Sequence, residues 1–390
     1  MALVSIVRHS STGGSLRKAL DLCEGLKGLK SNSRVLIKPN LVMGSERFQV
    51  LTKGTLTTAT IMEELVILLQ EYGCTDITIG EGSIVHEEVG INTATAFECA
   101  GMKDLADRRG VKLLDFYQEP FVKLELDGRR FEVAEAPLKA DFLINVPVLK
   151  THIQTKVSLG LKNTKGVLSM ASKKNCHRHG LEDHIAVLAN AVKPHLTILD
   201  GLYTVDYGPV NFQHKELGLL VAGKDPLAVD MVGSSLLGIA PDSVVHLVEY
   251  ANMQGRSVDL SWVEVSGEKI NEVGIKAAWD CAWLQDIVDS FGVKGLTAHT
   301  PGHSFCSGCI VSVNTMLRTF CSENPGATFD GVEVCVGREP RPSKDAKLVF
   351  LLGRCALESN PNVQDAIRVK GCPLSLNESY RLMKKHALPK

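Results

Sequence analysis

Over the first 240 residues the sequence alternates between short apolar segments and longer amphipathic ones. The short segments have the length and composition of buried strands, and the longer ones repeat apolar residues at helical spacing. In the segment from Thr57 to Tyr72, for example, Ile61, Leu65 and Leu68 share one helical face. Regular alternation of strands and helices predicts an α/β fold with a mostly parallel sheet, flanking helices and some antiparallel hairpin content.

The composition changes near residues 262–276, which indicates a domain boundary. We expect a larger α/β domain over residues 1–265 and a smaller α/β domain over residues 266–390. Six of the eleven cysteines lie between Cys306 and Cys372. The cysteines are therefore concentrated in the smaller domain rather than scattered along the chain.

The formal net charge is −1, so no overall field attracts the protein to nucleic acid or to a membrane surface. The segment from Met1 to Gly14 lacks the pattern of a secretory signal, and no apolar run reaches the length of a membrane span. We therefore expect a cytoplasmic protein without nucleic-acid or membrane partners. In that reducing compartment, cysteines bind metals or take part in chemistry rather than forming disulfides.

Polar residues follow four of the predicted strands. The segments are Lys38-Pro39-Asn40, Glu81-Gly82-Ser83, Lys150-Thr151-His152 and Asp200-Gly201. Each segment alone would be read as a turn or a solvated charge, but ligands of open α/β sheets bind outside the carboxyl ends of the strands. Four such segments at one edge therefore indicate a site, and we predict that Lys38, Asn40, Glu81 and Asp200 contact a substrate.

Positive charge is concentrated in residues 142–181, which contain no acidic residue. The basic residues there are Lys150, His152, Lys156, Lys162, Lys165, Lys173, Lys174, His177, Arg178 and His179. Ammonium groups and free backbone N–H groups both favour phosphate or carboxylate, so the segment predicts binding of an anionic small molecule. Asn163 and Lys165 are candidate substrate contacts, because the following Gly166 permits a close backbone approach. Lys173 and Lys174 are equally consistent with a solvated loop.

The histidines of this segment are candidate proton donors or acceptors, because histidine titrates near neutral pH. The predicted catalytic residues are His152, Lys162, Lys150, His177 and His179. Cys176, Asp183 and His184 lie close to them in sequence and leave a metal site open. Their spacing, however, fits no closed tetrahedral motif.

Four cysteines lie in three short elements that also contain glycine or proline. These elements are Cys306-Ser307-Gly308-Cys309, Gly353-Arg354-Cys355 and Gly371-Cys372-Pro373. Thiolates on separate loops beside glycine are typical of iron–sulfur sites, because glycine lets backbone N–H groups approach the cluster sulfides. The pattern resembles the proximal cluster site of the nickel–iron hydrogenase small subunit, although Leu374 stands where that pattern usually has a second proline. The resemblance implies that Cys306, Cys309, Cys355 and Cys372 bind a 4Fe–4S cluster.

Other interpretations of the cysteines stay open. Structural zinc also uses four thiolates, although it usually has two close C-x-x-C pairs. The pair Cys306 and Cys309 could instead be a redox dithiol, and buried thiols without any ligand are common. Cys321 and Cys335 are reserve ligands, because spacing alone does not exclude them.

Several segments of the first 250 residues together resemble a known family. They are Val35-Leu36-Ile37-Lys38-Pro39-Asn40, Asn145-Val146-Pro147 to Lys150-Thr151-His152, Leu161-Lys162-Asn163 to Gly166, His177-x-His179, Leu199-Asp200-Gly201, Gly208-Pro209, and Gly223-Lys224-Asp225-Pro226 with Ala228-Val229-Asp230. The chain is similar here to the domain-of-unknown-function family numbered 362. Many relatives combine this domain with iron–sulfur ligands, which agrees with the cysteine pattern. The chemistry of the family is unassigned.

A second resemblance covers two residues and the character of one loop. The lactate racemase family, which carries a nickel-pincer nucleotide, presents a histidine and a lysine ten residues apart. His152 and Lys162 have this spacing. The residues between them lack that family's run of glycines, so a nucleotide-type cofactor or an additional metal stays an open question.

Three functional hypotheses follow. The first is an iron–sulfur oxidoreductase that acts on an anionic small molecule or cofactor in a cleft lined by lysine and histidine. The second is a non-redox isomerase or lyase that uses His152 and Lys162. The third is an electron-transfer or maturation protein that docks on a redox partner protein. No Gly-x-Gly-x-x-Gly follows a strand and no Walker A motif is present, so the usual nucleotide fingerprints are absent.

Overall fold

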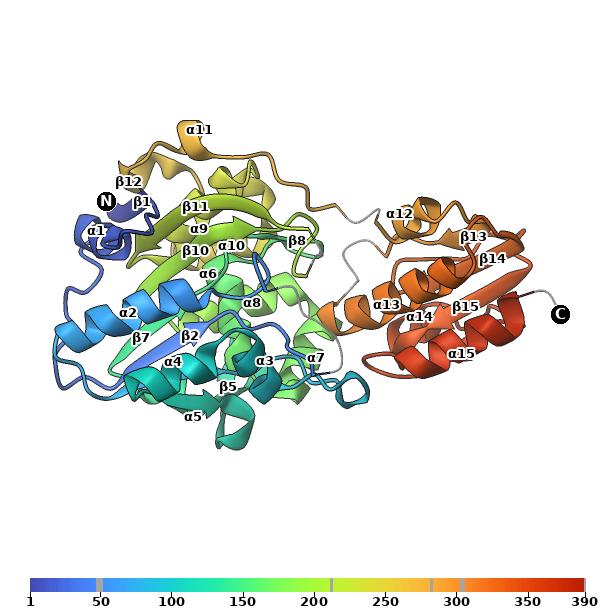
Figure 1. Ribbon diagram of the computed structural model, residues 1–390, viewed down its shortest axis with the longest axis horizontal. Coiled ribbons are helices and arrows are strands. Elements are labelled where there is room, and N and C mark those ends of the chain that lie inside the picture. Colours follow the sequence, from blue (N-terminus) through green and yellow to red (C-terminus); the bar gives the residue numbers. More distant parts are fainter. Residues whose placement is uncertain (47–51, 211–212, 281–282, 302–305, 389–390) are drawn as a thin grey trace. The chain divides into compact units, whose positions relative to one another are not determined.

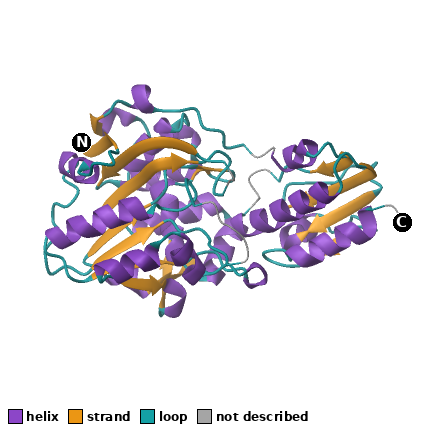
Figure 2. Ribbon diagram, viewed as in Figure 1, coloured by secondary structure: helices purple, strands orange, loops and turns teal. Residues whose placement is uncertain are grey.

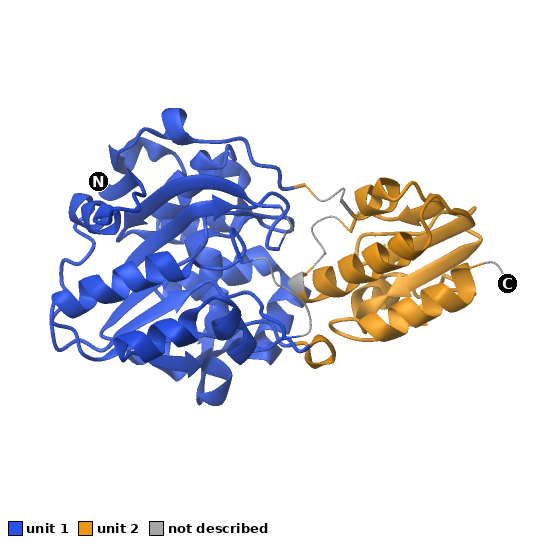
Figure 3. Ribbon diagram, in the orientation of Figure 1, with its two compact units in different colours: residues 1–85, 90–279 blue, residues 86–89, 280–390 orange. Residues whose placement is uncertain are grey.

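The computed structural model describes residues 1–46, 52–210, 213–280, 283–301 and 306–388. The chain forms two compact units (Figure 3). The first unit comprises residues 1–85 and 90–279, and the second comprises residues 86–89 and 280–390. The boundary expected from composition, between residues 265 and 266, lies inside the first unit.

The first unit is built around an eight-stranded sheet (Figure 1). In spatial order its strands are β12 (Val263–Gly267), β1 (Ala2–Arg8), β11 (Lys215–Gly223), β10 (Leu196–Thr204), β7 (Phe142–Val146), β2 (Val35–Pro39), β3 (Ile77–Glu81) and β4 (Lys112–Asp115). Only β11 runs antiparallel to its neighbours, β1 and β10. The predicted mostly parallel α/β sheet is therefore confirmed.

Two short hairpins accompany this sheet. One consists of β5 (Phe121–Leu126) and β6 (Arg129–Ala134), and the other of β8 (Thr151–His152) and β9 (Lys156–Val157). Asp127 and Gly128 join β5 to β6 with φ angles of 47° and 68°. Positive φ at both positions is what a two-residue hairpin turn requires, which explains the Asp-Gly signal in the sequence.

Helices cover both faces of the large sheet (Figure 2). They are α1 (Ser15–Leu22), α2 (Ala59–Glu71), α3 (Thr93–Cys99), α4 (Met102–Arg109), α5 (Glu135–Lys139), α6 (Leu159–Asn163), α7 (Met170–His179), α8 (Leu181–Ala191), α9 (Pro226–Leu236), α10 (Val245–Met253) and α11 (Ile270–Val273). Successive side chains of a strand point to opposite faces, so each face has its own core. Val35 and Ile37 pack with α1, α2 and α4, whereas Leu36 packs with α6, α8, α9 and α10.

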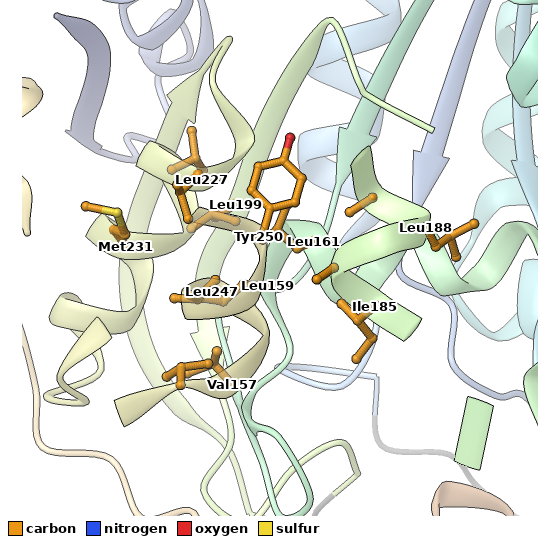
Figure 4. Packing of buried hydrophobic residues seen from close by; sticks show 14 of the residues in the cluster. Val157, Leu159, Leu161, Ile185, Leu188, Leu199, Leu227, Met231, Leu247 and Tyr250 are labelled. Atoms are coloured by element: carbon orange, nitrogen blue, oxygen red, sulfur yellow. The ribbon is translucent and has the colours of Figure 1, made fainter. Parts of the chain in front are cut away.

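The short helix α6 is anchored in the second of these cores. Its Leu159 and Leu161 are fully buried among side chains of α9 and α10, including Leu227, Leu247 and Tyr250 (Figure 4). Burying leucine side chains stabilises a helix that is too short to persist alone. The polar residues that follow on α6 are thereby held in one orientation.

The second unit contains a four-stranded parallel sheet of β13 (Lys294–Ala298), β14 (Thr328–Val336), β15 (Leu348–Leu352) and β16 (Ile367–Val369). Its helices are α12 (Trp283–Ser290), α13 (Ser307–Glu323), α14 (Gly353–Ser359) and α15 (Leu376–Ala387). The turn η1 (Glu87–Val89), which the chain places between β3 and α3, also belongs to this unit. In the described part of the chain, no helix combines the length and apolar character needed to cross a membrane.

Candidate functional site

A buried ion pair joins the carboxyl ends of β2 and β3. The Nζ atom of Lys38 lies 2.9 and 3.0 Å from the two carboxylate oxygens of Glu81. The carboxylate also accepts the backbone N–H groups of Leu41 and Gly82, each at 2.9 Å. Both side chains are only 3% exposed, so the charges compensate each other away from water.

Three asparagines extend this ion pair into a network. Asn163 Oδ1 accepts from Asn40 Nδ2 at 2.9 Å and from Lys38 Nζ at 3.3 Å. Asn163 Nδ2 donates to Asn145 Oδ1 at 2.8 Å. The polar residues at the ends of β2, β3 and β7 thus lie at the predicted edge of the sheet. They also form hydrogen bonds with one another and with Asn163 of α6.

Gly166 packs directly against the ion pair. A Cβ atom at this position would lie 2.3 Å from Glu81 Oε1 and 2.4 Å from Lys38 Nζ. The close backbone approach expected at Gly166 is therefore made to Lys38 and Glu81. A side chain here would force the ion pair apart.

Asp200 lies in the middle of β10 rather than at the expected strand end, and it is likewise engaged by the backbone. Its carboxylate accepts the N–H groups of Thr58 at 2.7 Å and Leu202 at 3.1 Å. The side chain is buried, and this burial raises the pKa of Asp200. Because Thr58 is the N-cap of α2, Asp200 fixes the start of that helix.

Lys150 begins a cluster of basic side chains in the first unit. It is fully buried, and its Nζ donates to the carbonyl oxygens of Thr55 at 2.5 Å and Pro209 at 3.0 Å. Burial lowers the pKa of Lys150 to about 7, although Glu81 acts in the opposite direction. Lys150 therefore titrates near neutral pH.

His152 has one ring nitrogen bonded and one free. Its Nδ1 accepts the backbone N–H of Gln154 at 3.1 Å, so the proton of the neutral ring resides on Nε2. Nε2 is buried and has no hydrogen-bond partner among the described residues. Burial, followed by the charges of Lys162, Lys150, His177 and Lys165, lowers the pKa of His152. The ring is thus a neutral donor within electrostatic range of several basic side chains.

Lys162 lies on α6, beside that cluster. Asp230 of α9 accepts the N–H groups of Gly160 and Leu161 at 2.7 Å each, which holds the start of α6. Burial and the charges of Lys165 and Lys150 lower the pKa of Lys162, whereas Glu182 raises it. Lys162 makes no hydrogen bond or ion pair with a described residue.

Two further lysines are bonded within the same region. Lys165 Nζ lies 2.6 Å from His177 Nε2. Lys173 Nζ donates to the carbonyl oxygens of Gly82 at 2.5 Å and Gly166 at 3.1 Å, and to the Tyr117 hydroxyl at 2.7 Å. Burial lowers the pKa of Lys173 to about 7. A solvated loop position, which the sequence left open for Lys173, is therefore wrong.

His177 and His179 point to different sides of α7. Residues two apart on a helix are separated by about 200° around its axis. His177 contacts Lys165, whereas the exposed His179 lines a groove of about 780 Å³ together with His184 and Arg129. Lys150, Lys162, Lys165 and His177 thus all act electrostatically on His152, whereas His179 belongs to the other side of α7.

The four cysteines predicted as ligands lie at helix starts and after a strand in the second unit. Cys306 is the N-cap of α13, and Cys309 lies in its first turn. Cys355 lies in α14, directly after β15, and Cys372 follows β16. None of the ten described cysteines forms a disulfide, and Cys281 lies outside the described residues.

The three cysteine elements lie against one another. The N–H of Arg354 donates to the carbonyl of Gly371 at 2.9 Å, and a Cβ at Gly308 would lie 3.2 Å from that of Pro373. A hydrogen bond with Cys306, then burial, raises the pKa of Cys309, and Cys372 contributes further. Small residues thus let the backbones of these loops approach each other. Among the described residues, no group of three or more His, Cys, Asp or Glu is placed to hold a single metal ion.

The reserve cysteines occupy different surroundings. Cys321 and Cys335 are fully buried, and burial raises their pKa values to about 11 and 12. Cys335 packs with Val349, Leu351 and Ala356 in an apolar cluster. These two positions therefore suit core packing and serve as controls for the other four.

The segment 86–89 supports the loop that carries Cys372. Glu88 accepts hydrogen bonds from Ser375 Oγ at 3.0 Å and from the N–H groups of Leu376 at 3.1 Å and Asn377 at 2.8 Å, at the start of α15. Ser312 Oγ lies 3.0 Å from His86 Nε2 and donates to the Leu374 carbonyl at 3.2 Å. A segment distant in sequence thus fixes both sides of the loop.

We expect Glu88→Ala to destabilise the start of α15 by about 1–2 kcal/mol, the usual effect of losing a helix cap. Hydrogen exchange at the Leu376 and Asn377 amides measures this directly. The neighbouring exposed Glu87 makes a matched control, since Glu87→Ala should leave both amides protected. Equal exchange in the two variants would show that Glu88 does not stabilise this helix.

Comparisons with known proteins concern mainly the first unit. Residues 35–235, just over half of the chain, match the model of a family described as Domain of unknown function (DUF362). A thylakoid-associated protein of Synechocystis sp. is 27% identical over 256 residues, which cover 62% of this chain and 76% of that protein. The lactate racemase apoprotein from Thermoanaerobacterium thermosaccharolyticum has a TM-score of 0.38 and 10% identity, over 87% of this chain and 69% of that chain. A similarity this low carries no argument about chemistry.

Proposed function

Because the chain belongs to the DUF362 family, a domain of unknown function, we propose its activity from its own residues: an iron–sulfur oxidoreductase that acts on an anionic small molecule. The anion would bind at the basic cluster of Lys150, His152 and Lys162. Cys306 and its three partner cysteines would hold a 4Fe–4S cluster in the second unit. The reducing cytoplasm suits both a cluster and free thiols.

One observation carries the anion site: a buried histidine donor without a partner lies among cations. Buried polar atoms are nearly always hydrogen-bonded, so the free Nε2–H of His152 needs an acceptor. The charges that act on it come from lysines and from His177. An anionic oxygen satisfies the donor and compensates the positive charge at once.

The same residues suit proton transfer. His152 would donate from Nε2 to a substrate oxygen, while its Nδ1 stays fixed by the Gln154 N–H. Lys162 would orient the anion or accept a proton, since its lowered pKa makes a neutral amine accessible. Lys150 is held by two carbonyl groups and would supply charge from a fixed position.

The cysteine elements fit an iron–sulfur cluster in their donor chemistry. Four thiols on three adjoining elements are available, and glycines beside them keep the backbone close. Cys306 and Cys309 lie at the start of the 17-residue α13, where the helix dipole opposes the rise in the pKa of Cys309 that Cys306 and burial cause. When bound, the cluster would supply one-electron transfer to or from the substrate.

A non-redox isomerase or lyase is the second candidate. It is favoured by the fact that His152, Lys150 and Lys162 belong to the first unit alone. These residues would then move protons next to a substrate carbonyl without electron transfer. Activity that persists in a folded protein lacking the cluster would favour this candidate.

The test is anaerobic purification followed by iron, zinc and sulfide analysis and a visible spectrum. We expect about four iron atoms and four sulfides per chain, with broad absorption near 400 nm. Cys355→Ala and Cys372→Ala should remove most of the iron. Cys321→Ala and Cys335→Ala, at the two fully buried positions, should retain it. Zinc without sulfide, or equal iron loss in all four variants, would contradict the cluster proposal.

A further inference from the structure

The hairpin that carries His152 contains a strained turn. In this hairpin β8 pairs with β9, and His152 lies opposite Lys156. The N–H of Val157 donates to the Thr155 carbonyl at 2.6 Å, which closes a three-residue γ-turn centred on Lys156. The φ angle of Lys156 is 59°, so this is the positive-φ form of the γ-turn, which is rare and strained. A residue with a side chain keeps such a backbone conformation only when its surroundings hold it there.

The side chain of Trp279 provides such a support for Lys156. The Nζ atom of Lys156 lies 5.0 Å from the centroid of the Trp279 ring, within the range of a cation–π contact. The tryptophan packs against the hydrophobic core of the first unit, to which the hairpin also belongs. The ammonium group is therefore attached to a ring that the core holds in place, and this contact opposes relaxation of the turn.

The residue before Trp279 contacts the other strand of the hairpin. The Thr151 hydroxyl, next to His152, donates to the Ala278 carbonyl at 3.1 Å. The same carbonyl accepts the N–H of Tyr207 at 2.8 Å. Ala278 and Trp279 thus hold both neighbours of His152, one along the chain and one across the hairpin.

The stretch of chain before these two residues is itself fixed to the end of α9. The N–H of Ile275 donates to the Leu236 carbonyl at 2.7 Å, and the N–H of Ala277 donates to the Leu237 carbonyl at 3.0 Å. The side chain of Ala277 is also buried. This stretch is therefore a firm support against which the hairpin can be held.

We propose that, at the anion site of the proposed function on which this inference rests, Trp279 is a positioning residue for His152. Through Lys156 it holds the strained turn closed and so orients the imidazole. The orientation depends on one bond inside the hairpin, in which the Gln154 N–H donates to His152 Nδ1 at 3.1 Å and leaves Nε2 as the donor for the anion. A turn that opens would release this N–H. The ring would then lose its fixed direction and its single tautomer.

Two substitutions at one position separate the strain from the contact. Lys156→Met and Lys156→Gly both remove the ammonium group from the Trp279 ring. Methionine keeps a side chain and hence the strain, whereas glycine adopts a positive φ without strain. We therefore expect Lys156→Met to loosen the hairpin and Lys156→Gly to keep it closed. Trp279→Leu should resemble Lys156→Met, and the double variant Trp279→Leu with Lys156→Gly should restore the hairpin.

Three measurements on the full chain follow the hairpin. Hydrogen exchange at the Gln154 amide reports its bond to His152, the ¹⁵N chemical shifts of the His152 ring report the tautomer, and calorimetry with sulfate reports anion affinity. In Lys156→Met and Trp279→Leu we expect the Gln154 amide to exchange about tenfold faster. The ring should become a mixture of tautomers, and sulfate affinity should fall about fivefold. Circular dichroism checks that all variants fold.

The matched control is a second cation–π contact of the first unit. The guanidinium carbon of Arg256 lies 4.7 Å from the centroid of the Trp262 ring, and Arg256 pairs with Asp225 at the start of α9. Trp262→Leu should therefore leave exchange at Gln154, the tautomer of His152 and the sulfate affinity unchanged.

Equal exchange in Lys156→Met and Lys156→Gly would overturn the proposal, because the strain of the turn would then have no consequence. So would a Trp279→Leu variant with an unchanged His152 tautomer, or a double variant that stays loose. If sulfate did not bind the unsubstituted protein, the anion site of the proposed function would be wrong. The exchange and tautomer measurements would still show whether Trp279 positions His152.

Discussion

Replacing Lys38 by methionine should lower the free energy of unfolding by about 3–5 kcal/mol, among the largest effects of any single substitution in the first unit. The reason is the carboxylate that remains. Glu81 is 3% exposed and would lose the ammonium group that lies 2.9 Å from it. Asn163 would also lose one of its donors. Urea denaturation followed by circular dichroism measures the loss.

A second substitution should recover much of this loss. In the double variant Lys38→Met with Glu81→Gln, no net charge is buried and the amide oxygen still accepts a backbone N–H group. We expect the double variant to be more stable than Lys38→Met alone. The exposed pair of Lys112 and Asp76 is the control, because Lys112→Met removes a surface ion pair of little energetic value. If Lys38→Met were as stable as Lys112→Met, the Lys38–Glu81 ion pair would not be what stabilises this edge of the sheet.

The sequence predicted where the polar residues gather but not what they bind. Lys38 and Glu81 do lie at the carboxyl ends of strands, as an apolar run followed by polar residues implies, whereas Asp200 lies in the middle of β10, which continues to Thr204. Their partners could not be predicted, since Lys38 and Glu81 are 43 residues apart and Lys38 and Asn163 are 125 apart. Pattern rules describe neighbours along one element, and these bonds cross between elements.

Two features of the site were missed: the contact of Tyr117 with Lys173 and the separation of His177 from His179. The elements that carry them were not predicted. Tyr117 follows the short strand β4, whose four residues are half-buried or exposed and show no apolar run. His177 and His179 lie on α7, where lysine, asparagine and histidine give no clear apolar stripe. The start of α7 does have a local sequence signal, because Ser169 accepts the N–H of Ser172 and caps the helix. With α7 recognised, helical spacing alone would have separated the two histidines.

In the second unit, too, the sequence predicted the helices and strands but not the contacts between distant segments. In the smaller domain the sequence predicts strands at residues 332–336 and 348–352 and helices near residues 310–319 and 376–386. The elements β14, β15, α13 and α15 include these segments. The contribution of residues 86–89 could not be foreseen, because their contacts with Ser312 and Ser375 span more than 200 residues. Nothing in a window of local sequence reports such a contact.

Asp230→Ala should destabilise the first unit by about 2–6 kcal/mol, because two buried N–H groups lose their acceptor at about 1–3 kcal/mol each. Asp230 is fully buried and is the acceptor for Gly160 and Leu161 at 2.7 Å. Binding of sulfate should weaken as well, since Lys162 lies on the helix that Asp230 holds. Chemical denaturation and calorimetry measure the two effects.

Asp225 on the same stretch of chain provides the matched control. Its carboxylate caps α9 by accepting the N–H of Ala228 at 3.0 Å, and it pairs with Arg256 rather than with α6. Asp225→Ala should therefore cost stability, as the loss of a helix cap does, without changing sulfate affinity. Asp230→Asn keeps one acceptor oxygen and should lie between Asp230→Ala and the unchanged protein in both measurements. If Asp230→Ala lost stability but bound sulfate with unchanged affinity, the position of Lys162 would not depend on Asp230. The leucines of α6 that pack against α9 and α10 would then be sufficient to orient it.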